Sequence, residues 1–316
     1  MQYPSAIKLI AFLILIAEFS IIALALFLFL PLANKGLEFQ INKGEDFGVI
    51  AQKLEDAGAV RSIWGLKLAE KISGGGNMVK AGKYKLEKDY GPFALVELLG
   101  NGPKKIIVRI PEGSTLVDVD RIFSEAGLLK KGTLFLLSQR LEGYLFPDTY
   151  EFYAGQPLGE MLEVINANFN SKTKDILPAG QEGDKAIILA SILEKEVQTE
   201  EDMRIVAGIL LKRMSSGMRL QVDATLCYDK QFATMGEWKD CYPITEEDKN
   251  SKSPMNTYRN HGLPPGPIGN PSLSAIKAAL DPASSSYLFY LSAPNGETIF
   301  SQNYEEHKKN ISIYLR

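Results

Sequence analysis

The stretch Ala186-Ile-Ile-Leu-Ala-Ser-Ile-Leu-Glu-Lys-Glu-Val197 decides more about this chain than any other segment. Its apolar and small residues predict a helix buried in a protein core. At helical spacing Glu194 shares a face with Ile187 and Ala190. A carboxyl group on an apolar stripe is partly desolvated, which raises its pKa and suits it to general acid catalysis. Periodicity alone leaves two alternatives open: a glutamate that faces solvent at the helix end, and Glu196 as an equal rival.

The segments around this helix predict a helix-rich α+β domain over residues 104–316. Turn and capping signals bound each element, and Asn295-Gly296 is a strong hairpin signal between two short strands. The expected elements are helices at Leu158–Phe169, Asp184–Val197, Glu201–Ser215 and Tyr304–Tyr314, a short helix capped by Ser272, and a late hairpin of Tyr287–Ser292 with Glu297–Ser301.

A repeat precedes this domain. Phe39–Gly58 and Val108–Gly127 each read as a strand, a glycine turn, an amphipathic helix and a C-terminal glycine. In the first copy a second helix from Arg61 to Ile72 and a strand from Ala81 to Leu86 follow. A strand, two helices and a strand resemble a LysM module, which binds glycan, so residues 37–103 are expected to form a LysM-like subdomain. A rigid spacer is the alternative.

The N-terminus predicts a transmembrane helix. In the run Leu9–Leu30 only Glu18 and Ser20 are not apolar, and a helix of that length spans roughly 33 Å, enough for a bilayer core. A cleaved signal peptide is the rival, but its apolar region is shorter and ends at a small-residue cleavage site. We therefore expect residues 1–8 to be a cytoplasmic tail and everything after Asn34 to be extracytoplasmic in a single-pass protein.

Composition excludes several classes of function. The 316 residues are 45% hydrophobic and 23% charged with a net charge of −3, which argues against a nucleic-acid partner. With two histidines and no clustered cysteines, we expect no metal site and no cofactor. Cys227 and Cys241 are left open as a disulfide or as two buried thiols.

Three loops bring polar and aromatic residues together in the way that sugar-binding grooves use. They are Leu141–Tyr150, Met218–Thr225 and the proline-rich segment Ser253–Pro271. A role in bracing these loops through backbone hydrogen bonds is the alternative. The candidate substrate-binding residues that they supply are Glu142, Asp148, Gln221, Asp223, Asn256 and Tyr258.

Taken together, these motifs resemble the endolytic murein transglycosylase, or YceG-like, family. The resemblance rests on Ala-Ser-Ile-Leu-Glu-Lys-Glu196, Arg219-Leu-Gln-Val-Asp-Ala-Thr225, Asn256-Thr-Tyr258 and Gly262-Leu-Pro-Pro-Gly266, in order along the chain. It implies a single-pass protein of the cell membrane and selects Glu194 as the catalytic residue. The family usually has proline at the position of Ala224, and histidine near Thr298, which puts local groove contacts in doubt.

The activity implied by the resemblance is cleavage of nascent peptidoglycan strands. Glu194 would protonate the oxygen between N-acetylmuramic acid and N-acetylglucosamine and then deprotonate the muramic C6 hydroxyl, giving a 1,6-anhydro end and ending strand elongation. Glycan strands, the membrane and peptidoglycan synthases are the partners it implies. The alternatives are a muramidase-type hydrolase, in which Asp223 or Asp148 activates water, and a non-enzymatic glycan-binding scaffold.

Overall fold

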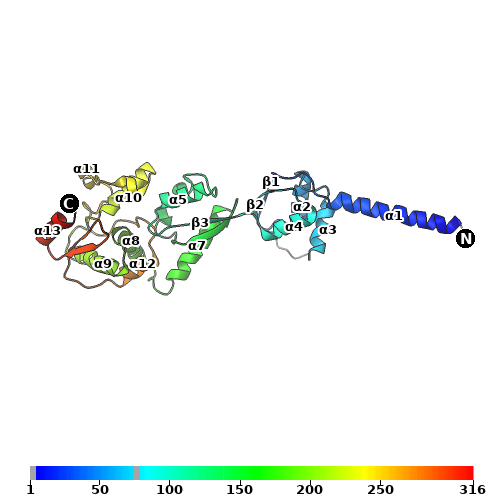
Figure 1. Ribbon diagram of the computed structural model, residues 1–316. Coiled ribbons are helices and arrows are strands. Elements are labelled where there is room, and N and C mark those ends of the chain that lie inside the picture. The colour runs from blue at the N-terminus through cyan, green and yellow to red at the C-terminus, as the bar shows by residue number, and fades with distance from the viewer. Residues whose placement is uncertain (1–4, 75–78, 138, 316) are drawn as a thin grey trace. The chain divides into compact units, whose positions relative to one another are not determined.

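The computed structural model describes residues 5–74, 79–137 and 139–315 (Figure 1). The chain forms two compact units. Unit 1 comprises Met1–Ile106 and Glu151–Pro157, and unit 2 comprises Ile107–Tyr150 and Leu158–Arg316. Helices predominate, and the strands form two-stranded sheets, which confirms the predicted mixed α+β class.

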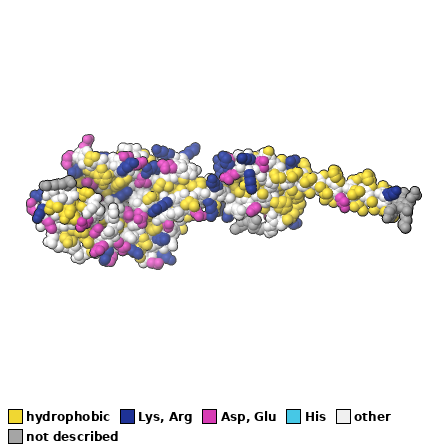
Figure 2. Space-filling model, in the orientation of Figure 1, with side chains coloured by type: hydrophobic (Ala, Val, Ile, Leu, Met, Phe, Trp, Pro, Cys, Tyr) yellow, Lys and Arg dark blue, Asp and Glu magenta, His cyan; other side chains and the backbone are white. Residues whose placement is uncertain are grey.

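Helix α1 (Ser5–Phe29) opens unit 1 and is apolar along almost its whole sequence, and apolar side chains cover the face seen in Figure 2. Its segment Ile7–Phe29 is long and apolar enough to cross a membrane, and it is exposed as far as Phe27. This agrees with the helix expected at residues 9–30. The tail expected at residues 1–8 overlaps this helix from Ser5 onward, and residues 1–4 lie outside the described part of the chain.

The rest of unit 1 has the predicted order of strand, two helices and strand, followed by a further helix. Strand β1 pairs antiparallel with β2, with Phe39 opposite Tyr84, and side-chain caps from Asp46 and Ser62 start the two intervening helices. The LysM-like character of this unit stays a prediction. Its elements are β1 (Glu38–Ile41), α2 (Phe47–Asp56), α3 (Ile63–Ile72), β2 (Gly82–Lys85) and α4 (Pro92–Asn101).

The second copy of the repeat also has the expected local structure. Strand β3 (Lys105–Arg109) leads to α5 (Leu116–Glu125), which begins with a capping box between Thr115 and Asp118. Strand β3 pairs with β4 (Thr149–Tyr153), which lies beyond the second copy of the repeat. Two short elements lie between them, α6 (Thr133–Leu137) and the 3₁₀ helix η1 (Gln139–Leu141).

The core of unit 2 surrounds helix α8. This helix is buried on nearly every side, and α9 and α12 pack directly against it. Ser272 caps α12 by accepting a hydrogen bond from the Ala275 amide at 3.1 Å, as predicted. The helices are α7 (Leu158–Thr173), α8 (Gln181–Glu196), α9 (Glu200–Ser215), α10 (Asp223–Thr234) and α12 (Leu273–Leu280).

The C-terminal part of unit 2 confirms the late hairpin. Strands β5 (Phe289–Ser292) and β6 (Thr298–Ser301) pair antiparallel, with Leu291 opposite Ile299. Helix α13 (Tyr304–Tyr314) follows and ends the described chain at the red end of Figure 1. Between α10 and α12 lie two short elements, the 3₁₀ helix η2 (Trp238–Cys241) and α11 (Glu246–Lys249).

Candidate active site

Helix α8 holds the proline-rich loop of residues 261–271 in place. Ser191 on α8 accepts a hydrogen bond from the Ile268 amide at 3.0 Å, and its own hydroxyl donates to the Ile188 carbonyl. Ser191 is almost fully buried, so this contact is protected from water. The loop therefore has a fixed position relative to both glutamates at the end of α8.

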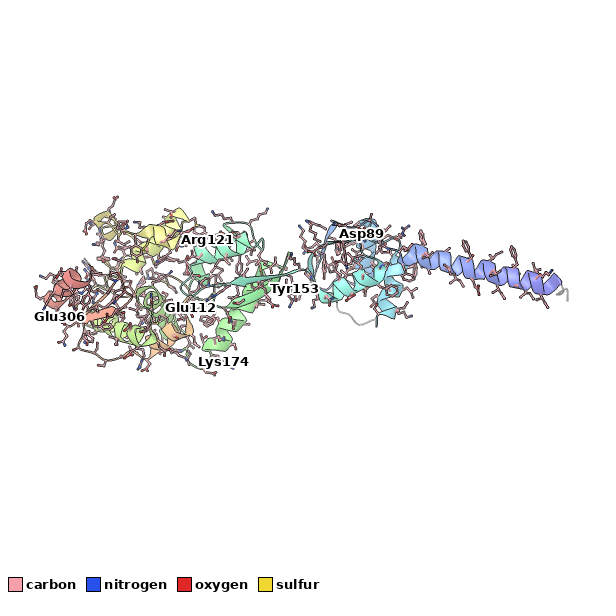
Figure 3. All side chains as sticks on the ribbon, viewed as in Figure 1. Asp89, Glu112, Arg121, Tyr153, Lys174 and Glu306 are labelled. Atoms are coloured by element: carbon pink, nitrogen blue, oxygen red, sulfur yellow. A yellow bond between two sulfur atoms is a disulfide. The ribbon has the colours of Figure 1, made fainter. Side chains whose placement is uncertain are left out.

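Glu194 lies against backbone. Its Oε2 accepts a hydrogen bond from the Ser272 amide at 2.8 Å, at the N-terminus of α12. Burial raises the pKa of Glu194, the bond from Ser272 opposes that rise, and the charge of Glu112 (labelled in Figure 3) adds to it. A Cβ atom on Gly113 would come within 3.3 Å of the Glu194 Cγ, so the side chain is also closely packed.

Glu196 instead lines a cavity of about 300 Å³ in unit 2. The Tyr290 hydroxyl donates a hydrogen bond to its Oε2 at 3.0 Å. Burial raises the pKa of Glu196 to about 7; the Tyr290 bond and Arg213 oppose the rise, and the charge of Asp223 adds to it. A carboxyl group with such a pKa is partly protonated at neutral pH, as a general acid requires. Polar residues lining this cavity include Arg213, Gln221, Asp223, Tyr258, Tyr290 and His307.

Three of the predicted substrate-binding residues line the same cavity. The Tyr258 hydroxyl donates to Oδ1 of Asp223 at 2.5 Å, and burial together with this bond raises the pKa of Tyr258. Gln221 has a φ of 54°, in the left-handed region that a non-glycine residue rarely adopts. The backbone amide of Gln221 donates a hydrogen bond to the Thr257 carbonyl at 3.1 Å. This bond holds the Gln221 backbone beside the Tyr258 loop.

Asn256 is placed differently from its neighbours in the sequence. It is fully buried, and its amide nitrogen donates to the carbonyls of Lys249 and Ser251 at 3.0 and 2.9 Å. Its oxygen accepts from the Tyr258 amide at 2.9 Å. These contacts occupy the whole side-chain amide, so in this structure Asn256 braces the loop that carries Tyr258.

Glu142 and Asp148 also lie apart from the Glu196 cavity. Glu142 lines a second cavity of about 450 Å³, where its carboxylate accepts from the Leu116 amide and the Tyr228 hydroxyl. Burial raises its pKa to about 7. Asp148 is exposed and accepts from Asn168, and this bond lowers its pKa. The structure therefore brings Gln221, Asp223 and Tyr258 together. Glu142 and Asp148 do not lie with them.

Arg213 and Tyr290, two residues of the cavity that act on Glu196, were not among the candidates drawn from the sequence. Arg213 on α9 is nearly buried and donates to the carbonyls of Leu288 and Leu220 at 2.8 and 2.6 Å. It continues the apolar face of Val206 and Leu210 at helical spacing, and a charge at such a position is a signal that could have found it. Tyr290 comes from the hairpin, and no local pattern indicated its contact with Glu196.

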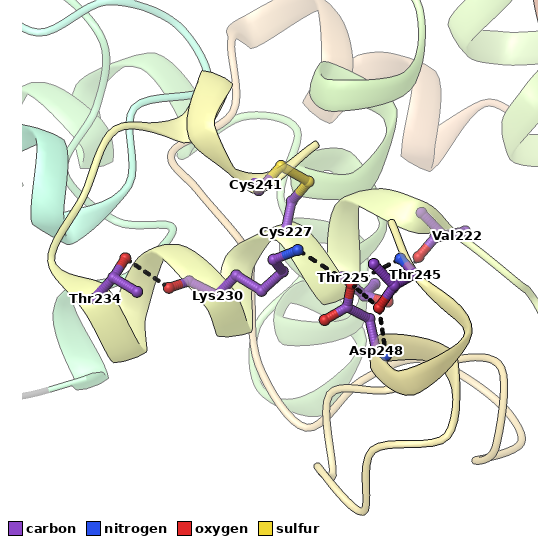
Figure 4. The surroundings of a disulfide bond; sticks show 8 residues. All are labelled: Val222, Thr225, Cys227, Lys230, Thr234, Cys241, Thr245 and Asp248. Atoms are coloured by element: carbon purple, nitrogen blue, oxygen red, sulfur yellow. Dashed lines mark hydrogen bonds and ion pairs between the residues drawn. A yellow bond between two sulfur atoms is a disulfide. The ribbon is translucent and has the colours of Figure 1, made fainter. Parts of the chain in front are cut away.

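A disulfide fixes the segment that follows α10. Cys227 is bonded to Cys241, which decides the question that the sequence left open (Figure 4). Cys227 lies one turn after Asp223 on α10, and Tyr242 follows Cys241 directly. Burial and the charges of Glu196 and Asp223 raise the pKa of Tyr242 to about 12, although half of its surface is exposed. Tyr242 therefore lies within electrostatic reach of the cavity.

Comparison with known proteins gives consistent matches. The model of the YceG-like family matches residues 39–313. A protein of Bacillus subtilis (strain 168) named endolytic murein transglycosylase is 27% identical over 285 residues, which cover 88% of this chain and 72% of that protein. A protein of the same name from Streptococcus pneumoniae (serotype 2, strain D39) is 26% identical, and the match covers 90% of this chain and 59% of that protein.

A solved structure supports the fold. The 2.6 Å crystal structure of a YceG-like protein from Listeria monocytogenes matches with a TM-score of 0.55 at 27% identity. The match covers 88% of this chain and all of the Listeria chain. The shared fold thus extends over most of the residues that form both units.

Proposed function

The chain belongs to the YceG-like family, and from this premise we propose that it is a lytic transglycosylase that cuts peptidoglycan glycan strands internally. The names of the Bacillus and Streptococcus relatives support this activity. The observation in this molecule that carries the proposal is that Glu196, whose pKa burial raises to about 7, lines one cavity together with Gln221, Asp223 and Tyr258.

The geometry favours Glu196 as the acid. The sequence motifs favour Glu194, and that assignment stays a prediction that Glu194→Gln and Glu196→Gln can decide. Glu194 is hydrogen-bonded to backbone and does not line the cavity, whereas Glu196 lines it beside Asp223, Gln221 and Tyr258. A general acid must come within hydrogen-bonding distance of the glycosidic oxygen, so the carboxyl group that lines a cavity is the better candidate.

The proposed reaction has two proton transfers through one carboxyl group. Glu196 donates a proton to the oxygen that links N-acetylmuramic acid to N-acetylglucosamine, and positive charge develops at the muramic anomeric carbon as that bond breaks. The ionised Glu196 then takes the proton of the muramic C6 hydroxyl, whose oxygen bonds to the anomeric carbon. The negative charge of Asp223 stabilises the oxocarbenium-like state.

The other predicted residues fall into two groups. We assign sugar contacts to Gln221 and Tyr258, because both line the cavity and present polar groups. For Asn256 we propose loop bracing, since its amide is used by backbone. To bind substrate, Glu142 would need a glycan strand that reaches the second cavity. Asp148 would need a strand that contacts the exposed surface. Their substrate roles remain the sequence-based proposal.

The same proposal places the catalytic unit outside the cell. Helix α1 would anchor the chain in the cell membrane, and the Cys227–Cys241 disulfide supports an oxidising, extracytoplasmic compartment. Unit 1 would bind glycan as a LysM-like module, and peptidoglycan synthases that make the nascent strands would be partners. Cleavage of those strands would end their elongation.

A muramidase-type hydrolase is the second candidate, because Asp223 lines the cavity beside Glu196 and two-carboxylate hydrolases use such a pair. Mass spectrometry of fragments released from purified peptidoglycan separates the possibilities. A transglycosylase leaves ends that are lighter by one water than the reducing ends of hydrolysis. Reducing ends would establish the hydrolase, and intact strands that are bound but uncut would establish the non-enzymatic scaffold.

A further inference from the structure

The length of α1 shows where its C-terminal end lies in a bilayer. The apolar segment Ile7–Phe29 has 23 residues, which at 1.5 Å per residue extends about 34 Å, slightly more than the ~30 Å hydrocarbon core. When α1 spans a bilayer, its last turn therefore lies at the boundary between acyl chains and headgroups. This placement rests on the proposed membrane anchor.

Helix α3 begins directly beside that last turn. A Cβ atom on Gly65 would lie 2.8 Å from the Leu28 carbonyl oxygen, so only glycine allows the two helices to approach this closely. Arg61 lies over the Phe27 ring, 5.8 Å from its centroid, and Phe93 of α4 packs on Phe29 at 5.0 Å between centroids. The first turn of α3 is thus held at the level of the membrane boundary.

A buried asparagine makes this junction rigid. Asn34, just after α1, donates from its amide nitrogen to the carbonyls of Ala59 and Tyr90, both at 2.8 Å. Its oxygen accepts from the Tyr90 amide, also at 2.8 Å. Asn34 is 2% exposed, so these bonds are shielded from water. The orientation of α3 relative to the end of α1 is therefore fixed.

The outward face of α3 is apolar with a basic edge. Trp64, Leu68 and Ile72 follow one another at four-residue spacing and are 76%, 43% and 62% exposed. Single exposed apolar residues are normal, but a stripe of three on one helix face is the pattern of an interfacial helix. Lys67 and Lys71 are exposed beside the stripe, and the Lys67 ammonium lies 5.9 Å from the Trp64 ring centroid.

We propose that the α3 stripe (Trp64, Leu68 and Ile72, with Lys67 and Lys71) docks on the surface of the membrane that α1 crosses. Tryptophan is favoured at the headgroup level, and lysines attract anionic headgroups there. Continuity with the membrane-spanning helix and this charge complementarity identify a lipid surface as the occupant. Unit 1 is then attached to the membrane at two places, through α1 and through α3.

Tryptophan fluorescence of the full-length chain in lipid nanodiscs tests the docking. The chain has two tryptophans, so Trp238→Phe leaves Trp64 as the sole emitter. We expect its emission to be blue-shifted and strongly quenched by a lipid that carries a spin label near the headgroup. A label near the acyl-chain end should quench it much less. Quenching should weaken when anionic lipid is omitted, and Lys67→Gln with Lys71→Gln should remove that dependence.

A relocated tryptophan controls for proximity to the anchor alone. Lys83→Trp, made together with Trp64→Phe and Trp238→Phe, places the emitter on β2, at the end of unit 1 away from α1 (Figure 1). Equal quenching at both positions, or unquenched Trp64 in a chain that has entered the disc, would overturn the docking. A shift that appears only with two chains per disc would overturn it in favour of a second copy. Failure of the chain to enter discs would instead refute the proposed anchor.

Discussion

Glu194 and Glu196 are two residues apart on one helix, and burial raises the pKa of both, yet their surroundings differ. Glu194 accepts a hydrogen bond from the backbone amide of Ser272 and packs against Gly113. Glu196 is approached by side chains from α9, α10 and the hairpin, and these enclose open space. Lys195 between them lies with its ammonium over the Trp238 ring, 3.6 Å from the ring centroid. A shifted pKa therefore does not identify a catalytic acid unless substrate can reach it.

Two matched substitutions give the largest expected effect. Glu196→Gln keeps the shape of the side chain but removes the transferable proton. Because one carboxyl serves both proton transfers, we expect kcat to fall by about 10³- to 10⁴-fold, near the upper end for general acid–base catalysis. Glu194→Gln should change kcat less than about tenfold. Formation of anhydro ends is the measurement, with melting curves as the control for folding. The opposite ranking would restore Glu194 as the acid.

The pH dependence should report the same residue. Glu196 must be protonated to act, so kcat/KM should fall about tenfold per pH unit as pH rises above about 7. Its pKa is raised on folding, so the stability it contributes is present below its unfolded pKa of about 4.3 and is lost as pH rises through about 7. At a pH of about 8, about one unit above that pKa, Glu196→Gln should therefore be more stable than the native chain. If the alkaline limb of the pH–activity profile is unchanged in Tyr290→Phe, Arg213→Met and Asp223→Asn, the limb belongs to a group other than Glu196.

Gly113→Ala disturbs the packing of Glu194 and of the neighbouring Lys195. Gly113 has a φ of 71°, and the added Cβ would contact the Glu194 side chain. We expect unfolding free energy to fall by about 1–3 kcal/mol, as for other strained backbone positions. Activity per folded molecule should stay unchanged if Glu196 is the acid. Thermal unfolding and kcat measured on one preparation check both parts, and a large loss of kcat in folded protein would point back to Glu194.

Tyr290→Phe should produce the smallest change. The tyrosine hydroxyl donates to Glu196 and so favours its ionised form. Removing it should move the alkaline limb of the pH–activity profile to higher pH by up to about one unit, equivalent to ~1.4 kcal/mol. Tyr258→Phe is a suitable comparison, because its hydroxyl is bonded to Asp223 instead. A shift to lower pH in Tyr290→Phe would show that the contact acts differently.

Local patterns in the sequence predicted the elements of this fold well. Alternating strands around Asn295-Gly296, the cap at Ser272 and the apolar run of α1 are properties of short segments, and all three appear in the structure. The helix α10 was not anticipated, because the sequence from Gln221 to Thr225 was interpreted only as a polar loop.

The candidate site was harder to predict, because its parts come from distant segments. Helix α8 is buried nearly all round, so helical periodicity gave no exposed face by which to separate Glu194 from Glu196. Tyr290 and Arg213 reach Glu196 only through tertiary packing. Asn256 has a side chain of the kind that binds sugars, but here its amide is bonded to backbone carbonyls. No sequence motif reveals those contacts.

The hydrogen bonds of Asn34 also determine how fast unit 1 can reorient. A domain on a flexible tether wobbles on the nanosecond timescale of loops and termini. Asn34 joins the end of α1 to two segments in the rest of unit 1, so α1 and the rest of the unit should rotate as one body against the viscosity of the bilayer. Polarised emission from a probe on unit 1 should consequently show little nanosecond decay, and Asn34→Ala should restore that fast component.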